Sequence, residues 1–394
     1  MNGTAVVVGG GIGGLATAVA LHRIGWTATV LEAADRPREV GAGLSLSPNA
    51  LRALDAIGLG TAARAIGVPS WASHTVRNPS GRHLMRPPDR SDPPLRAFRR
   101  GDLHRMLADA VPAGWLRTEA RVLDVDTSAD RPIVRHTGGE LAADLVVGAD
   151  GIHSTVRGLL RPDAPGPRFL HRAGWLGLAD TTAPVGPGGA EDLAGSLTLG
   201  PHTMVLLHPV AAHQVYWAVL VHADRPGTGA PSLAQVRDRV GDWHHPIPEL
   251  LAGTPEETVR WVDIHGLPPL PSYVSGPVAL LGDAAHAMSP DRGQGAGQSI
   301  EDATVLAAAL AGSADVRTAL ARYDAERRPR TQATVRDAEA AGRRVLEAGP
   351  VARALTALMM RAMPAGAWDR VTARGLGWLW DWTPPAVTSP ATPS

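Results

Sequence analysis

The sequence contains no lysine and no cysteine, and only two of its 394 residues are phenylalanine. All 38 basic residues are therefore arginine, and they balance 38 acidic residues. The absence of lysine excludes Schiff-base enzymes, pyridoxal-phosphate enzymes and P-loop nucleotide sites, each of which needs a lysine amine. The absence of cysteine excludes thiol nucleophiles, disulfides and cysteine-ligated zinc or iron–sulfur sites.

The remaining composition indicates a globular protein. Hydrophobic residues make up 44% of the chain and charged residues 19%, which leaves enough apolar material for a core. The length predicts about two or three domains. A formal net charge of zero gives no reason to expect nucleic-acid binding. None of the 15 histidines stands in a metal-ligand spacing such as H-E-x-x-H, so we expect no metal site.

One uncharged stretch, residues 3–21, is long enough to cross a bilayer. Six of its nineteen residues are glycine, and no basic segment precedes it. We therefore expect neither stable membrane insertion nor a signal peptide, and a cytoplasmic protein.

The glycines of this stretch belong to a nucleotide-binding pattern. The β-branched run Thr4–Val8 predicts a buried parallel strand, and Gly9, Gly11 and Gly14 after it fit G-x-G-x-x-G. Apolar residues at helical spacing follow, and a second strand is expected at Thr27–Leu31. The alternative is a glycine-rich turn in an unrelated α/β unit.

The spacing of these glycines has a physical reason. Gly9 permits a tight turn, Gly11 lets the backbone approach a pyrophosphate, and Gly14 lets helix and strand pack closely. Glu32 follows the second strand, 18 residues after Gly14, and is placed to accept hydrogen bonds from an adenosine ribose. This pattern alone does not separate NAD from FAD.

Two further motifs place an acidic residue after a hydrophobic strand. In the first, a strand ends at Gly148, Asp150-Gly151 forms a turn, and a helix begins at Ser154. In the second, the strand Val278–Leu281 is followed by Gly282 and Asp283. The second motif continues through Pro290, Gly293, Gly295, Ala296 and Gly297 into a helix over Ser299–Leu310. The positive N-terminus of that helix would stabilise negative charge on a flat, electron-rich group.

The order of these three motifs resembles the single-component FAD-dependent aromatic hydroxylases, the family of p-hydroxybenzoate and salicylate hydroxylases. The resemblance covers roughly residues 4–330. Residues 41–51, which include Gly43, look like the family's segment after the acidic residue, and Arg100–Leu107 looks like its Arg-x-x-Leu-x-x-x-Leu helix.

The resemblance implies an α/β fold, in which a Rossmann-like FAD-binding domain is interleaved with an antiparallel-sheet substrate domain and followed by C-terminal helices. The expected FAD-binding domain spans residues 1–70, 100–170 and 275–330, and the substrate domain spans 71–99 and 171–274. Residues 331–382 form the helical segment, and 383–394 form a disordered tail.

The resemblance also implies that FAD is bound non-covalently and which residues bind each part of it. The ADP half is assigned to the dinucleotide turn and Glu32, the diphosphate or ribityl region to Arg100, and the ribityl chain to Asp283. Asp150 serves both FAD and the nicotinamide cofactor. The full cofactor set is Gly9, Gly11, Gly13, Gly14, Glu32, Gly43, Arg100, Asp150, Gly282, Asp283, Pro290, Gly293, Gly295, Ala296 and Gly297.

Two positions depart from the family pattern. Many relatives carry asparagine where Gly297 stands and an aromatic or apolar residue where Asp291 stands. We expect Asp291 to face solvent; contact with substrate or nicotinamide is the alternative.

The middle of the chain predicts antiparallel strands at Thr203–Leu207 and Gln214–His222, separated by a loop at Pro209–His213, with a possible third at Ser196–Leu199. Alternation divides residues 216–222 between two faces, but it does not reveal which face lines the substrate site. His208, Tyr216 and His222 are the candidate catalytic residues, and each is alternatively a surface or core residue.

The implied reaction is monooxygenation. NADPH or NADH reduces FAD, dioxygen forms a flavin 4a-hydroperoxide, and one oxygen atom passes to an aromatic or other electron-rich small molecule, with His208 or His222 as a possible base. Epoxidation or ring cleavage of a non-aromatic natural product, a non-catalytic FAD-binding protein and an NAD-dependent dehydrogenase are the alternatives. Halogenation is set aside because the family's halogenases use a lysine. We expect a monomer or homodimer.

The C-terminal part predicts helices at Thr331–Leu346 and Val351–Met363. The second carries Leu355, Leu358 and Met359 on an apolar face, which we expect to pack on the protein rather than on a membrane. The tryptophans of residues 378–382 are expected to be buried against the core or a partner subunit.

Overall fold

The computed structural model describes residues 3–35, 42–71, 75–85, 94–128, 131–185, 193 and 195–387. Its centre is a six-stranded sheet with the order β18-β19-β12-β1-β2-β8, in which all neighbours are parallel except β18 and β19. Its strands are β1 (Thr4–Val8), β2 (Thr27–Leu31), β8 (Leu116–Arg117), β12 (Leu145–Gly148), β18 (Val274–Ser275) and β19 (Val278–Leu280).

Apolar helices cover this sheet because its strands are hydrophobic on both faces. Helices α1 (Ile12–Arg23) and α9 (Gly295–Ala311) pack with β1 and β2 in one core cluster. A small sheet of β9 (Val122–Asp126), β10 (Ile133–His136) and β11 (Gly139–Ala142) contributes Val122, Val125 and Val134 to the same cluster. The remaining helices of this region are α2 (Pro48–Ala56), α3 (Gly60–Ile66), α4 (Arg100–Asp109), α5 (Thr155–Leu160) and α8 (Asp283–His286).

A seven-stranded sheet forms the second region, with the order β17-β13-β16-β15-β14-β5-β6. All its neighbours are antiparallel except β14 and β5. Its strands are β5 (Thr75–Arg77), β6 (His83–Met85), β13 (Arg168–Asp180), β14 (Ser196–Gly200), β15 (Thr203–Ala211), β16 (Gln214–His222) and β17 (Arg260–Gly266). Strand β15 extends through Pro209 to Ala211, so the loop predicted from Pro209 is wrong; an irregularity in register there accommodates the proline.

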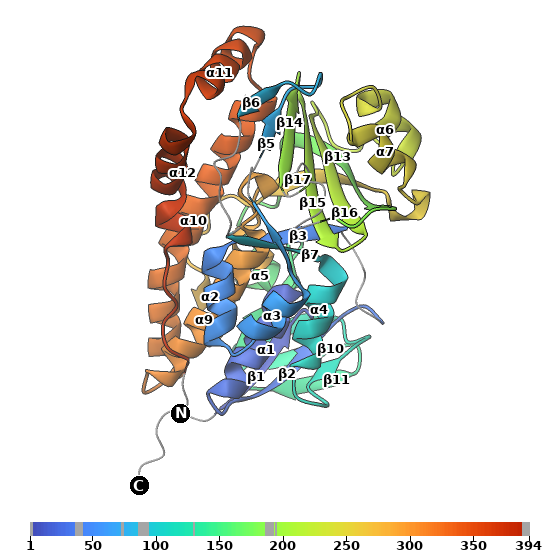
Figure 1. Cartoon of the computed structure of the whole chain (residues 1–394). Coiled ribbons are helices and arrows are strands. Elements are labelled where there is room, and N and C mark those ends of the chain that lie inside the picture. The colour runs from blue at the N-terminus through green and yellow to red at the C-terminus, as the bar shows by residue number, and fades with distance from the viewer. Residues whose placement is uncertain are drawn as a thin grey trace.

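The two faces of the seven-stranded sheet have different cover. Helices α6 (Leu233–Val240) and α7 (Ile247–Ala252) lie on the outer face, where Trp217, Val219 and Val221 pack against them (Figure 1). The inner face, which carries Tyr216 and Ala218, packs against Ala42 and Ala97. Ala97 belongs to a three-stranded sheet, β3 (Gly43–Leu46), β7 (Leu95–Arg99) and β4 (Val68–Ser70), which lies between the two larger sheets.

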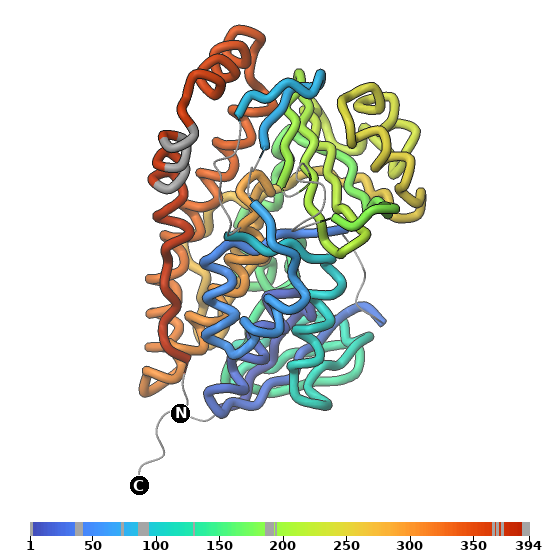
Figure 2. Tube along the Cα trace, in the orientation of Figure 1, coloured from blue at the N-terminus to red at the C-terminus, as the bar shows by residue number. Residues whose placement is uncertain are grey.

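The chain crosses between the two regions several times. In Figure 2 the dark blue N-terminal segments and the orange segments near residue 300 lie together, and the yellow-green and yellow segments form the other region. This interleaving is the architecture that the family resemblance implied.

Helix α10 (Val316–Leu346) runs along both regions and continues into α11 (Pro350–Ala362) and α12 (Ala365–Trp380) (Figure 1). It begins at Val316, well before the predicted start, and passes through Pro329. The expectation for α11 is wrong in part: Ala357 and Met360 pack against Val76 and Leu84, but Leu355, Leu358 and Met359 are exposed. None of the described helices is long and apolar enough to cross a bilayer.

Of the tail predicted to be disordered, residues 388–394 lie outside the described residues. The prediction does not hold for Val387, which is 5% exposed and belongs to the main core cluster, as does the half-buried Trp382. Two short 3-10 helices, η2 (Glu256–Thr258) and η3 (Pro290–Arg292), precede β17 and α9 respectively.

Candidate active site

The sequence-predicted acids converge at one edge of the six-stranded sheet. Strands β2, β1, β12 and β19 are parallel neighbours, so their carboxyl ends lie side by side. Glu32 follows β2, Asp150 lies two residues after β12, and Asp283 follows β19 closely. In doubly wound sheets this edge, where the strand order reverses, is where nucleotides bind.

The turn between β1 and α1 requires two of its glycines. Gly9 has φ +108°, and a side chain there would place its first carbon 2.4 Å from the carbonyl oxygen of Ala149. At Gly14 the same carbon would lie 2.0 Å from the carbonyl oxygen of Gly9, and at Gly13 it would lie 2.8 Å from Leu281. At Gly11 it would meet nothing within 4 Å. Gly11 therefore leaves open space at the N-terminus of α1, where a diphosphate is favoured.

Glu32 is held in position by backbone N–H groups. Its two carboxylate oxygens accept hydrogen bonds from the amides of Gly10, at 2.8 Å, and Ala34, at 2.9 Å. Each oxygen retains a lone pair, so a ribose hydroxyl can still donate to it. His104 of α4, which the sequence did not single out, places Nε2 2.7 Å from the carbonyl oxygen of Gly10 and so also fixes the turn.

The Asp283 motif is anchored by a buried carboxylate behind it. Gly282 has φ +57°, and its N–H donates to Asp302 Oδ2 at 2.9 Å. Asp302 also contacts His286 Nε2 at 2.6 Å and Arg327 Nε at 2.7 Å. Burial by itself would raise the pKa of Asp302, but the charges of His286 and Arg327 outweigh it and lower that pKa to about 2. Asp283 itself begins α8 with an exposed side chain.

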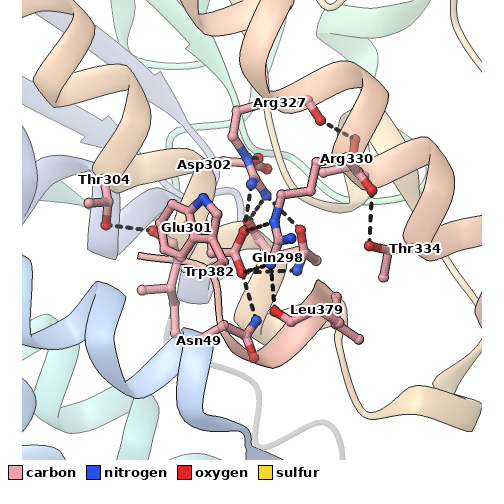
Figure 3. Close-up of polar contacts among 12 residues, drawn as sticks. Asn49, Gln298, Glu301, Asp302, Thr304, Arg327, Arg330, Thr334, Leu379 and Trp382 are labelled. Atoms are coloured by element: carbon pink, nitrogen blue, oxygen red, sulfur yellow. Dashed lines mark hydrogen bonds and ion pairs between the residues drawn. The ribbon is translucent and has the colours of Figure 1, made fainter. Parts of the chain in front are cut away.

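A buried polar network joins α2, α9 and α10 (Figure 3). Glu301 accepts hydrogen bonds from Asn49 at 2.6 Å and from Arg327 at 2.5 Å. Asn49 also donates to Gln294 at 3.0 Å, and Gln294 donates to Ser47 at 2.7 Å. The network therefore fixes the segment that follows Gly43 relative to the start of α9. The Glu301-Asp302 pair inside an apolar helix was the available sequence signal for it.

The segment before α9 leaves space for a ligand on one side. Gly293 has φ +61°, and a side chain at Gly295 would meet nothing within 4 Å. Ala296 is half-buried and Pro290 is exposed. Gly297 faces α2 instead, because a side chain there would lie 3.0 Å from Ala50 Cβ. Helix α9 has 17 residues, so its N-terminus presents free N–H groups and partial positive charge to this space.

The expectation that Asp291 faces solvent is wrong. Its side chain is 5% exposed, and its Oδ2 lies 2.6 Å from Nη1 of Arg172, which is 2% exposed. Arg172 also donates to Ser289 Oγ at 2.7 Å and to the carbonyl oxygen of Glu339 at 3.1 Å. The reason is that β13, a strand the sequence did not predict, brings Arg172 onto the inner face of its sheet.

Asp150 and Arg100 occupy different surroundings. Asp150 accepts hydrogen bonds from Ser154 Oγ and from the amide of Val156, so its carboxylate holds the start of α5. Arg157 of α5 donates to the carbonyl oxygen of Ala284 at 3.0 Å and thereby ties α5 to α8. Arg100 is the exposed first residue of α4, directly after β7.

The structure brings two of the three candidate catalytic residues together. His208 and Tyr216 are register partners on the inner face. His208 Nδ1 lies 2.7 Å from Ser70 Oγ, and burial lowers the pKa of His208 to about 4, so it is neutral at pH 7. Burial raises the pKa of Tyr216, and the charge of Arg100 partly opposes this. Gly43 makes room for the ring, since a side chain there would lie 2.5 Å from Tyr216 Cγ.

His222 lies apart from them, at the other end of β16. Its register partner is Arg172, its ring stacks on that of His171 at 6.4 Å, and its Nε2 lies 3.4 Å from Asp224. In the part of the chain that the structure describes, no group of three or more histidine, aspartate or glutamate residues is arranged to hold a metal ion.

Several known proteins resemble this chain in sequence and in fold. A family model described as FAD binding domain matches residues 3–338. The chain is 36% identical to aurachin C monooxygenase/isomerase of Stigmatella aurantiaca, over 82% of this chain and 85% of that protein. It is 35% identical to 3-amino-4-hydroxybenzoate 2-monooxygenase of Streptomyces cremeus, over 82% of this chain and 83% of that protein.

The chain belongs to the single-component FAD-dependent aromatic hydroxylases. Solved structures agree in fold. That of Klebsiella pneumoniae HpxO complexed with FAD and uric acid has a TM-score of 0.84 at 26% identity, covering 95% of this chain and 97% of that one. A salicylate hydroxylase substrate complex has a TM-score of 0.77 at 25% identity, covering 97% and 96%.

As a member of this family the chain is an FAD-dependent monooxygenase, and its residues fit the cofactor. Open space at Gly11 and Gly295 adjoins the N-termini of α1 and α9, which favour negative charge. The carboxylates of Glu32 and Asp283 stand at the same sheet edge as acceptors for hydroxyl groups. The helix N-termini therefore supply donors for a diphosphate, and the carboxylates supply acceptors for a ribose and a polyhydroxyl chain.

Proposed function

We propose that this monooxygenase takes its electrons from NADPH or NADH and inserts one atom of dioxygen into an aromatic or other electron-rich small molecule. The observation that carries the proposal is the position of the inner face of the seven-stranded sheet, which packs against the β3–β7 sheet beside the nucleotide edge. A substrate on that face would lie next to bound flavin. FAD, when bound, supplies the electron transfer and oxygen activation that no side chain of the protein provides.

The cofactor roles are assigned from these positions. The diphosphate is assigned to the open space at Gly11 and to Arg100, the ribose to Glu32, and the ribityl chain to Asp283. The ring is assigned to the space between the segment that follows Gly43 and Gly295, where the N-terminus of α9 stabilises negative charge. The segment that follows Gly43 and the start of α9 form two walls of this space. Hydrogen bonds from Asn49 to Gln294 and Glu301 hold the two walls at a fixed separation.

His208 and Tyr216 are proposed as the polar groups closest to the substrate. Because His208 is neutral at pH 7 and its pKa is about 4, it is a weak base and acts as a hydrogen-bonding group. His222 is assigned no part in the reaction because it lies beside Arg172 at the far end of the strand. The apolar side chains around Tyr216, including the half-buried Leu176, Leu178 and Leu206, keep water away from this face, which protects the oxygen transfer from wasteful release of peroxide.

The test is a turnover assay with the FAD-loaded full chain. NADH and NADPH oxidation are followed with a panel of phenols, hydroxybenzoates and aminophenols, and the mass of each product is measured for a gain of one oxygen atom. Rapid anaerobic mixing separately records bleaching of the flavin absorbance by each nicotinamide. The proposal requires ligand-stimulated oxidation together with an oxygenated product. Flavin that neither nicotinamide reduces, with or without any ligand of the panel, would overturn it.

A further inference from the structure

The inner face of the seven-stranded sheet carries an apolar strip. In an antiparallel sheet, register partners point to the same side, so the strip can be followed strand by strand. Tyr216 pairs with Leu178, Ala218 pairs with Leu176 and Leu206, and Leu220 pairs with Met204. We define the strip by its members on β13, β14, β15 and β16, which are Leu176, Leu178, Leu197, Leu199, Met204, Leu206, Tyr216, Ala218 and Leu220.

Five leucines of the strip remain half-buried in the folded chain: Leu176, Leu178, Leu197, Leu199 and Leu206. On the outer face of the same strands, Val205, Leu207 and Val219 are at most 2% exposed because α6 and α7 cover them. Accessible leucines on a face turned toward the rest of the protein provide apolar contact area for a ligand. At the end away from Tyr216 the strip packs against Leu346 of α10 and Met360 of α11, so the accessible leucine surface runs from Tyr216 toward these helices.

The charged groups beside the middle of the strip are engaged within the protein, whereas the charge of Arg100 acts on Tyr216 at one end of the strip. Arg172 is paired with Asp291 and bonded to Ser289. Arg260, at the edge strand β17, donates to the carbonyl oxygens of Glu257 and Val259. His208 is neutral at pH 7. Arg99 ends β7 and Arg100 begins α4, on the wall that we assign to FAD.

A carboxylate placed against the middle of the strip would lose its water without gaining a cationic partner among these residues, which is costly. An alkyl group placed there would gain contact area instead. Resting on the proposed function, we infer that the substrate is a neutral aromatic molecule with an extended apolar substituent, and not a small ionised hydroxybenzoate.

Equilibrium binding tests this inference without turnover. The FAD-loaded full chain is titrated in the absence of nicotinamide, and the shift of the flavin absorbance reports occupancy. Two matched pairs separate charge from apolar length: 4-hydroxybenzoate against its methyl ester, and phenol against 4-heptylphenol. The neutral ester and the alkylphenol are each expected to bind at least tenfold tighter than their partners. Equal or tighter binding of 4-hydroxybenzoate, or no binding of 4-heptylphenol, overturns the inference.

A substitution in the middle of the strip gives a second test. Leu206→Arg is expected to lower 4-heptylphenol affinity at least tenfold and to raise 4-hydroxybenzoate affinity, since it adds a bidentate cation to the face. Leu206→Met, which conserves volume and polarity, is the matched control and should keep the wild-type preference. Leu176→Gln covers the case in which the arginine variant does not fold, and it should weaken only the binding of the alkylphenol. An unchanged preference in folded Leu206→Arg or folded Leu176→Gln contradicts the inference.

The two proposals fail separately. If 4-heptylphenol binds tightly but no ligand stimulates NADH or NADPH oxidation, the proposed function fails and the substrate class stands. If 4-hydroxybenzoate binds best and is oxygenated, the proposed function stands and the substrate class is wrong.

Discussion

The three acids at the nucleotide edge differ in how many hydrogen bonds their carboxylates already accept from the protein. Glu32 accepts two backbone amides, and Asp150 accepts a hydroxyl and an amide at the start of α5. Asp283 is exposed, with Gly282 behind it fixed by Asp302. Among the three, substitution of Asp283 should therefore disturb the fold least.

Asp283→Ala is expected to raise the dissociation constant for FAD at least tenfold, because the variant loses a charge-assisted hydrogen bond to the ligand. The midpoint of thermal unfolding of the FAD-free protein should stay within about 2 °C of the wild-type value, because the variant loses no hydrogen bond to the described residues. Fluorescence titration with FAD and calorimetry measure the two effects. Asp163→Ala, an exposed acid elsewhere, is the control and should change neither. Unchanged FAD affinity of Asp283→Ala would refute the ribityl assignment.

His208 makes the stability of the protein depend on pH. Its pKa falls from the ordinary value of 6.5 to about 4 in the folded state because of burial. Between these values the unfolded chain binds more protons than the folded chain, so stability falls as the pH is lowered from about 6.5 to about 4. The shift corresponds to a loss of about 3 kcal/mol across that window.

We expect His208→Gln to remove most of this acid-dependent loss while keeping a side chain that can bond to Ser70. Denaturant unfolding at several pH values gives the comparison with wild type. His213→Gln, which alters an exposed histidine, should retain the wild-type pH dependence. An identical slope in wild type and His208→Gln would show that His208 is not held neutral.

At the scale of elements, β13 and η3 are joined by a buried ion pair. Arg172 reaches from the seven-stranded sheet to Asp291 and Ser289 in the segment before α9, and to the carbonyl oxygen of Glu339 on α10. Three elements that are distant in sequence therefore meet at one guanidinium. Removing one member of such a pair leaves a buried charge uncompensated, whereas removing both avoids that cost.

Asp291→Asn is expected to lower the free energy of unfolding by about 3–5 kcal/mol, and the double variant Asp291→Asn, Arg172→Met to recover at least half of the loss. Urea unfolding of the three proteins provides the values. Asp124→Asn, which breaks the exposed pair with Arg135, should cost no more than about 1 kcal/mol. A double variant less stable than Asp291→Asn would mean that the pair is not the source of the stabilisation.

Sequence patterns predicted the elements that local residues specify. Strands β1, β2 and β16 begin and end where the residue patterns indicated, and the helix predicted to begin at Ser154 has Ser154 as its N-cap. Strand β13 was not predicted, and the strand predicted at Thr203–Leu207 continues to Ala211 as β15. The continuation of a strand through proline, like that of α10 through Pro329, depends on neighbours that sequence windows do not contain.

At the scale of the whole molecule, the C-terminal segment closes back onto the nucleotide-binding region. Arg330 of α10 donates to the carbonyl oxygens of Trp378 and Leu379, at 3.1 and 2.7 Å, and Arg52 of α2 donates to that of Trp382 at 3.0 Å. The Trp382 ring lies 5.5 Å from the Arg330 guanidinium and beside the buried network (Figure 3). The end of α12 is therefore fastened to α2 and α10 together.

Trp382→Ala is expected to cost about 2 kcal/mol of stability, from lost apolar contact and a lost cation–π interaction. It should also speed limited proteolysis after residue 380. Trp378→Ala, which alters a tryptophan that is 44% exposed, is the matched control and should cost less than about 1 kcal/mol. Equal effects of the two substitutions would contradict the anchoring role of Trp382.

The sequence by itself determined the nucleotide-binding turn, the three acids after their strands and the family, because each motif is complete within a short stretch whose spacing has a local physical cause. Only the tertiary structure decided which face of β16 is turned inward, because alternation defines two faces equally well and the cover by α6 and α7 selects between them. The tertiary structure likewise decided that Asp291 is buried in an ion pair, since its partner Arg172 is 119 residues away and approaches only when β13 joins the sheet. Long-range pairing of this kind has no local signature in the chain.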